Sequence, residues 1–306
     1  MKLPLLRRFW RNLASLGRRR SPSAVGDAVC SAISDTQWQT TLAALPLLRG
    51  LSPQARQQLR QLSEAFLAQK SMHAAAGLEL TDAMRLSIAA QACLPILALG
   101  LHCYDDWVGI VVYPGQFRVS RQEMDEFGVV HEFEDVLAGE SWPGGPVVLS
   151  WEDVAQAGTG YNLVLHEFAH KLHMRAAHAR GGDAEDFPLP LHPHRSQPYL
   201  RAADYQQQWR AAYACLCRYV ERPVDHLANR PVDRFDRSVE SAPPGGNAMP
   251  TTALLRRIDP YAAEHPAEFF AVMSEVFFTD ASLLARDWPD LYQLLMQFYC
   301  QDPAGI

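Results

Sequence analysis

The sequence predicts an α+β fold in which helices predominate, and three observations support this prediction. Apolar residues recur at helical spacing between about residues 38 and 101, and helical patterns return from residue 204 onward. Short runs rich in β-branched residues lie between residues 108 and 151. Residues 163–172 are apolar almost all round, which is typical of a buried helix. We therefore expect a mostly helical molecule with a small sheet.

Composition and charge restrict the classes of protein to consider. The chain has 306 residues, of which 48% are hydrophobic and 20% charged, so it is long enough to bury a sizeable core. Its net charge is −6, but residues 1–20 carry seven cations and no acid, which leaves −13 on the remainder. So acidic a body argues against nucleic-acid binding as the main task. The six cysteines are too sparse for a disulfide scaffold, and we expect them to be reduced.

Residues 1–36 are predicted to form a basic, flexible N-terminal extension. Their longest apolar run, residues 3–6, is too short for the apolar region of a signal peptide. The alternative to a solvated segment is a weak contact of residues 5–17 with an acidic surface or with anionic lipid. Residues 86–104 lack charged side chains, but Pro95 interrupts them. This favours a buried helix that ends near Cys93 over a transmembrane span.

Local signals justify the individual elements in chain order. Ser52 followed by Pro53 begins one helix, and Thr81 caps the next. The central apolar helix is capped by Thr159 or Asn162. Strand-like runs occupy residues 109–113, 117–119 and 146–151. Later helices are expected at residues 204–220, about 262–278 and 288–299, with irregular segments at 181–198 and 221–260.

The central helix carries His-Glu-Phe-Ala-His at residues 166–170, which matches the H-E-x-x-H pattern of zinc enzymes. Residues four apart share a helical face, so both imidazoles can reach one metal ion at ~2.0–2.1 Å. Glu167 projects about 100° around the helix. From there its carboxylate can take a proton from a zinc-bound water without being a ligand. The alternative is a chance match in which two buried histidines are hydrogen-bonded core residues.

Two other segments bear on this motif. In zinc peptidases of this kind, the strand before the helix is commonly an edge strand that pairs with the substrate backbone. We predict that Val147–Trp151 is this edge strand. Residues 131–135 begin like the motif, but they end in Asp135 instead of a second histidine. They are predicted to form a solvated acidic turn or helix.

A catalytic zinc site needs a third protein ligand and an open position. Position 173 is His and position 176 is Ala, so the extended motif with a third histidine is absent and another helix must supply the ligand. Glu268 is favoured because an acid on an otherwise apolar helix needs a partner or a metal. Glu275, on the same face, can instead hold a ligand in place. The alternatives that remain open as third ligand are Glu264, Glu275, and a histidine such as His173 or His178.

At these residues the sequence resembles the Mlc titration factor A family, bacterial cytosolic zinc metallopeptidases of the gluzincin type. Their core is similar to the catalytic domain of anthrax lethal factor. The resemblance is carried by residues 165–172 and 258–275, and further by 94–101, 113–114, 141–142, 145–151 and 297–303. It implies a single zincin-like peptidase domain at residues 37–303, mostly helical, with a small mixed sheet and an active-site helix. Residues 176–257 would then be an enlarged loop and helical insertion.

The resemblance also implies roles for individual residues. It implies one Zn²⁺ per chain, held by His166, His170 and Glu268, with Glu167 as the general base. It further implies that Tyr261, seven residues before Glu268, donates a hydrogen bond to the developing oxyanion. The alternative for Tyr261 is packing at the helix entrance.

One departure from the family pattern concerns position 173, where the family usually has Asp and this chain has His173. A carboxylate behind the metal ligands is then missing, or Asp183 or Glu275 supplies it. We expect this difference to alter metal affinity.

The resemblance implies a cytoplasmic zinc-dependent peptidase, aminopeptidase-like on small substrates, that hydrolyses peptide bonds with a zinc-bound water activated by Glu167. It implies peptide substrates, no transmembrane segment, and a regulatory link to the glucose repressor Mlc. The alternative is a non-catalytic, repressor-binding titration protein that retains a zinc site. The presence of Glu167 favours the enzyme, since a protein that only binds has no need of a general base.

Overall fold

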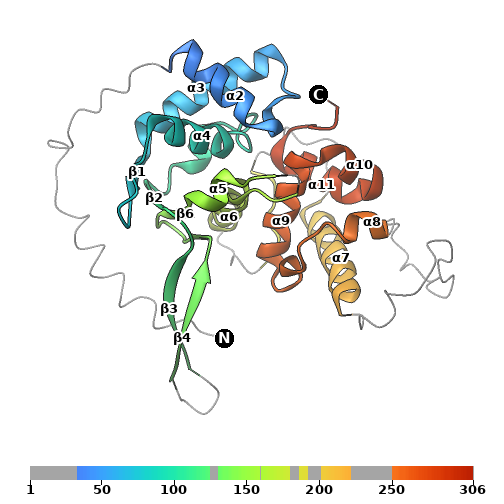
Figure 1. The fold of residues 1–306 in the computed structure, drawn as a ribbon. Coiled ribbons are helices and arrows are strands. Elements are labelled where there is room, and N and C mark those ends of the chain that lie inside the picture. The colour runs from blue at the N-terminus through green and yellow to red at the C-terminus, as the bar shows by residue number, and fades with distance from the viewer. Residues whose placement is uncertain are drawn as a thin grey trace. The chain divides into compact units, whose positions relative to one another are not determined.

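The computed structural model describes residues 33–124, 130–158, 160–179, 186–191, 201–221 and 250–305. Residues 33–306 form one compact unit, whose elements Figure 1 shows in chain order. Its first part contains helices α2 (Asp35–Ala44), α3 (Pro53–Gln69) and α4 (Asp82–Cys93), and the 3-10 turns η1 (Pro46–Leu48) and η2 (Leu101–Tyr104). The strands are β1 (Ser71–Ala74), β2 (Gly109–Tyr113), β3 (Phe117–Met124), β4 (Val130–Leu137), β5 (Gly139–Ser141) and β6 (Val147–Ser150). The remaining helices are α5 (Trp151–Ala155), α6 (Leu163–His178), α7 (Ala202–Val220), α8 (Thr252–Leu255), η6 (Pro260–Ala263), α9 (Pro266–Thr279), α10 (Ala281–Asp287) and α11 (Pro289–Tyr299).

The N-terminal helices begin where their capping residues predict. Ser52 caps α3, and Thr81 caps α4, which ends at Cys93 as expected. Most of the predicted N-terminal extension, residues 1–32, lies outside the described residues, and its last residues contact the body of the protein. Ile33 is buried in the core, and Ser34 forms a capping box with Gln37 at the start of α2. No helix of the described part of the chain is both long and apolar enough to cross a membrane.

Four strands form the main sheet in the order β1-β2-β6-β5. The first three run parallel, and β5 pairs antiparallel with β6 in a register that places Gly139 opposite Leu149. The prediction that Val147–Trp151 is the edge strand is therefore wrong. The strand β6 is interior and fully buried, as its continuous apolar run indicates, and Trp151 already belongs to α5. The edge next to β6 is β5.

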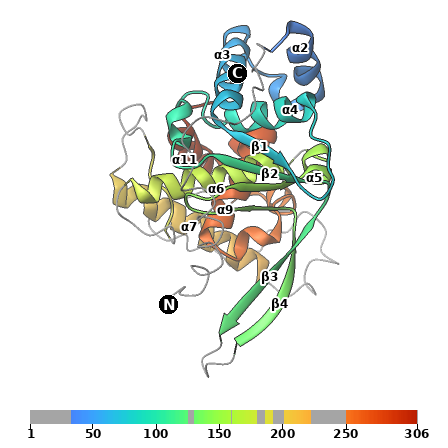
Figure 2. The ribbon, with the colours of Figure 1, turned by 90° about the vertical axis from the view of Figure 1, so that its left-hand side faces the viewer.

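A second, two-stranded sheet consists of β3 and β4, which pair antiparallel along their whole length. Figure 2 shows this ribbon extending away from the helices. Residues 131–135 lie within β4, so the prediction of an acidic turn or helix there is wrong. The backbone groups of these residues pair with those of β3 across the ribbon and do not form a local turn. Only Ala138 separates β4 from β5.

Helix α6 packs between the sheet and α9 (Figure 2). One side of α6 faces β5 and β6, and another faces α9, whose residues 269–278 are all buried. Phe168 of α6 packs against Tyr104 and Trp107 with ring centroids 5.3 and 5.5 Å apart. The sequence did not predict α10, which fills the interval between the two expected C-terminal helices. The motif-bearing helix is thus held in the core from both sides.

Candidate metal centre

The N-terminal end of α6 is fixed by Asn162. The Asn162 side-chain oxygen accepts a hydrogen bond of 2.9 Å from the backbone N–H of Leu165, so Asn162 caps the helix as one of the two predicted candidates. From this start, His166 and His170 fall on the same helical face. Their Nε2 atoms are 3.1 Å apart, and their rings meet edge to face.

Glu268 joins the two histidines from α9, 102 residues further along the chain. Its Oε2 lies 3.1 Å from His166 Nε2 and 3.3 Å from His170 Nε2. Zinc bonds of ~2.0–2.1 Å in a tetrahedron place ligand atoms roughly 3.3 Å apart, so this spacing fits a zinc ion. Two imidazoles and a carboxylate are also a donor set of catalytic zinc sites. Among the described residues, this is the only group of three found with metal-ligand geometry.

The other candidate ligands lie elsewhere. Glu264 is exposed at the end of η6, and His178 ends α6 two turns beyond His170. His173 is buried, and its Nε2 donates a 2.7 Å hydrogen bond to the carbonyl of Asp186. Burial is the main reason that the pKa of His173 falls to about 4. Asp183, a candidate to replace the missing carboxylate, lies outside the described residues.

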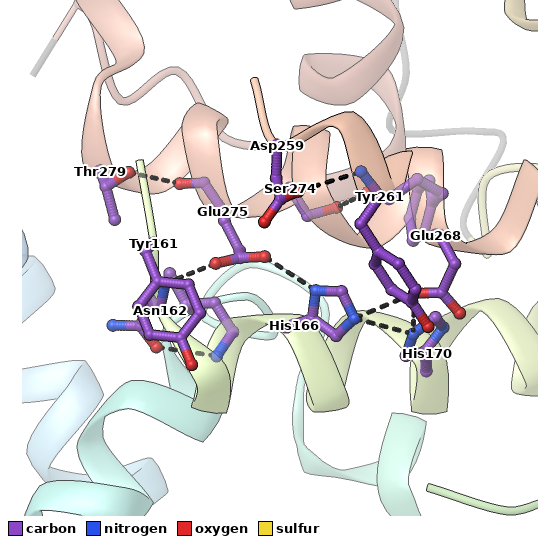
Figure 3. A network of polar contacts seen from close by, with 12 residues as sticks. Tyr161, Asn162, His166, His170, Asp259, Tyr261, Glu268, Ser274, Glu275 and Thr279 are labelled. Atoms are coloured by element: carbon purple, nitrogen blue, oxygen red, sulfur yellow. Dashed lines mark hydrogen bonds and ion pairs between the residues drawn. The ribbon is translucent and has the colours of Figure 1, made fainter. Parts of the chain in front are cut away.

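Glu275 supplies a carboxylate behind His166. Its Oε1 accepts a 2.8 Å hydrogen bond from His166 Nδ1, and its Oε2 accepts one from the backbone N–H of Asn162. The side-chain amide Nδ2 of Asn162 donates a 2.7 Å hydrogen bond to Gln91 Oε1 of α4. Figure 3 shows this chain of contacts, except Gln91, along α6. The contact to Nδ1 fixes the ring so that Nε2 faces Glu268.

The charges of these groups depend on one another. Burial alone would lower the pKa of His166, but its hydrogen bonds to Glu268 and Glu275 outweigh burial and raise the pKa well above its ordinary value. Burial alone would raise the pKa of Glu268, but the contacts of its carboxylate with His166 and His170 outweigh burial and hold the pKa below its usual range. The carboxylates thus stabilise positive charge at the point where the three donor atoms meet.

Glu167 lies on the neighbouring face of α6 and points toward β5. A Cβ atom on Gly139 would lie 2.4 Å from Glu167 Oε1 and 2.7 Å from Leu163 Cδ1, so any other residue at that position of the strand would displace these two side chains. The Glu167 side chain is buried, and its Oε2 has no hydrogen-bond partner among the described residues. Burial raises the pKa of Glu167, and the nearby His166 and His170 oppose this shift. Such a carboxylate can accept a proton.

Tyr261 reaches the site from η6. The backbone N–H of Tyr261 donates a 2.9 Å hydrogen bond to Asp259, and the Tyr213 hydroxyl of α7 donates a 2.8 Å bond to the Ala263 carbonyl. The helical path is interrupted between η6 and α9, which begins at Pro266, so Tyr261 does not lie on the same helix as Glu268. The Tyr261 side chain is 43% exposed, and Figure 3 shows its phenol directed toward His170 and Glu268.

The sequence did not indicate a role for Tyr161. This residue directly precedes the helix cap, is 39% exposed, and donates a weak hydrogen bond of 3.4 Å to Asp153. In Figure 3, the rings of Tyr161 and Tyr261 lie on either side of His166 along the helix. The only available signal was an aromatic residue immediately before the cap of the motif helix.

Comparisons with a family model and with individual known proteins lead to the same family. A sequence model of the family described as glucose-regulated metallo-peptidase M90 matches residues 18–300. A protein from Klebsiella pneumoniae named Mlc titration factor A is 37% identical over 272 residues, which is 88% of each chain. Proteins of the same name from Pectobacterium atrosepticum and Salmonella arizonae are 34% and 36% identical over 88% and 89% of this chain, and over 87% and 93% of their own.

Proposed function

This chain belongs to the glucose-regulated metallo-peptidase M90 family, and we propose that it is a zinc-dependent peptidase with one Zn²⁺ held by His166, His170 and Glu268. The observation that carries the proposal is the convergence of two imidazole nitrogens and one carboxylate oxygen at mutual distances of 3.1 to 3.3 Å. The buried contact of Glu275 with His166 supports it further, because catalytic metal sites orient their histidines in this way.

The residues around the ligands have distinct tasks in this proposal. Zinc in this site would polarise the substrate carbonyl and lower the pKa of a coordinated water to roughly 7. Glu167 takes the proton of the attacking water on its buried carboxylate and delivers it to the departing amine. Tyr261 donates a hydrogen bond from its phenol to the carbonyl oxygen, and this bond strengthens as the oxygen gains charge.

We assign substrate-backbone binding to β5 instead of β6. The strand β5 is the last of its sheet, and its Gly139 contacts Glu167, so a peptide paired with its outer edge would pass the general base. The finer assignment, an aminopeptidase-like activity on small peptides in the cytoplasm, rests on the family resemblance.

The experiment that tests the proposal measures zinc content and hydrolysis on the same preparations. Purified protein should contain one zinc per chain by elemental analysis and should cleave members of a peptide panel, with chelator abolishing cleavage and zinc restoring it. His166→Ala and Glu268→Ala should lose both zinc and activity. Full zinc content in His166→Ala, or hydrolysis that persists after complete removal of zinc, would contradict the assignment.

A second candidate function follows from the name of the relatives. Mlc titration factor A names a protein that titrates Mlc, and we propose that this chain also binds an Mlc-type repressor. Binding of purified Mlc by Glu167→Gln protein, measured by calorimetry, separates the two functions. Undiminished binding by a variant that no longer cleaves peptides would favour a titration role independent of catalysis, and no binding by the wild-type chain would remove this role.

A further inference from the structure

The structure describes two of the three lysines in the chain, Lys70 and Lys171; both are buried, and the ammonium group of each donates hydrogen bonds to backbone carbonyls. Lys171 is 3% exposed and Lys70 is 7% exposed. Their Nζ atoms lie 5.2 and 4.3 Å from the ring centroid of Trp107. A buried lysine is retained only where its ammonium finds several acceptors, so each of these residues holds its acceptors in place.

Lys171 holds the turn between β5 and β6. Its Nζ donates hydrogen bonds to the carbonyl of Trp142 at 2.6 Å and to the carbonyl of Gly145 at 2.7 Å. The same Trp142 carbonyl accepts the N–H of Gly145 at 3.1 Å, and Gly144 adopts φ +64°, which favours glycine. One ammonium group thus anchors both ends of this turn to α6.

The strand β5 therefore contacts α6 at two places. Its first residue, Gly139, rests on Glu167, and the turn that follows it rests on Lys171. Glu167 and Lys171 are four residues apart and so share one helical face. His166 and His170 repeat the same spacing one position earlier and face α9. The strand, the general base and the two histidine ligands are consequently positioned by two adjacent pairs of residues on one helix, 166–167 and 170–171.

We propose that Lys171 is a positioning residue that sets the edge strand β5 against Glu167, and so aligns a bound peptide with the metal centre. The inference rests on the peptidase function proposed above. The shape of the lysine side chain suits this task, because a compact ammonium can bond two carbonyls of one tight turn. A guanidinium is planar and larger, so Lys171→Arg cannot occupy the same enclosure without moving the turn.

The test compares Lys171→Met with Lys70→Met, each of which keeps an apolar stem and removes the charge. Lys70 is a matched control, because it bonds the Tyr104 and Trp107 carbonyls and directly precedes β1, at the opposite edge of the sheet from β5. In Lys171→Met, hydrogen exchange of residues 139–145 should accelerate by about tenfold or more. Its KM for peptides should rise by about tenfold, with zinc content unchanged. Both variants should lower Tm by a similar amount. Lys70→Met, however, should leave the hydrogen exchange of residues 139–145 and the KM for peptides unchanged.

Several results would overturn the proposal. Unchanged exchange at residues 139–145 in Lys171→Met would show that the ammonium does not hold the turn. Equal rises of KM in both variants would show that Lys171 acts only through general stability. If the wild-type chain cleaves no peptide, the proposed function fails, while the exchange measurement still decides whether Lys171 positions β5.

Discussion

Two faces of α6 carry side-chain pairs at the same four-residue spacing, offset by one position. His166 and His170 face α9 with side chains 14% and 12% exposed, and their nitrogens converge with Glu268 on one point. Glu167 and Lys171 face β5 and are almost fully buried. The first face brings together donor atoms that could hold a metal ion, whereas the second face contacts the protein's own backbone. Changes on one face should therefore alter metal binding, and changes on the other should alter turnover with the metal retained.

Glu167→Gln tests this separation with the largest expected effect. Loss of the general base should lower kcat by ~10²–10⁴-fold, while elemental analysis should find zinc content unchanged. Glu264→Gln, a change at an exposed acid near the site, serves as the control and should behave as wild type. Loss of zinc in Glu167→Gln, or retention of more than half the rate, would erase the distinction between the two faces.

Tyr261→Phe tests the phenol that approaches the two histidines from η6. Removing the phenol O–H should lower kcat by roughly 10–10³-fold, the scale for one oxyanion donor, with little change in KM or zinc content. The matched control is Tyr161→Phe, the other half-exposed tyrosine beside His166, for which we expect little change in kcat. An effect confined to KM or to Tm would make Tyr261 a packing residue.

Gly139→Ala tests the β5 face without touching an ionisable group. The new methyl group would meet Glu167 Oε1 at 2.4 Å, so the carboxylate must move. A displacement of about 1 Å can cost about 10²-fold in rate, and we expect kcat to fall on that scale with zinc retained. Gly50→Ala is the control, since a methyl group there meets no atom within 4 Å. A fully active Gly139→Ala protein would show that the position of Glu167 is not critical.

Glu275→Gln tests whether the contact behind the histidine face tunes metal binding. The amide is a weaker acceptor for His166 Nδ1, so zinc affinity should fall by about 10–100-fold in competition with a chromophoric chelator. At saturating zinc, kcat should stay within a few-fold of wild type. Unchanged affinity would make Glu275 a structural residue for the α6 N-terminus alone.

A change at His173 should affect activity least of all, but it should alter how the stability of the fold depends on pH. The pKa of this buried side chain is lowered to about 4, so below about pH 6.5 the unfolded chain binds a proton that the folded chain does not. Stability should therefore fall as pH drops from about 6.5 toward 4, by about 2 kcal/mol at pH 5. His173→Asn should remove this slope between pH 7 and 5 in urea unfolding. An unchanged slope would assign it to other groups.

Local signals in the sequence predicted the elements that local interactions determine. The caps at Ser52, Thr81 and Asn162 and the end of α4 at Cys93 are where residue type and spacing predict them. The motif and the family resemblance identified the residues that the structure brings together with Glu268. These features depend on short-range hydrogen bonds or on a motif of fixed spacing.

The remaining features depend on contacts between distant residues. Whether β6 is an edge or an interior strand is decided by β5, whose three residues are too short to show a period. The bonds of Lys171 to the turn span 26 and 29 residues, and the fit of Gly139 against Glu167 spans a similar interval. A lysine and a glycine in isolation carry no signal of such partners.

The metal centre also has a consequence for the connectivity of the chain. The proposed ligands His166 on α6 and Glu268 on α9 are separated by 102 residues, so the packing of these two helices closes a long segment of the chain. Closing a loop costs only about 0.6 kcal/mol more for each doubling of its length. Lengthening this segment should therefore cost little stability, provided that the insertion leaves its core residues, such as Phe187 and Trp209, in place.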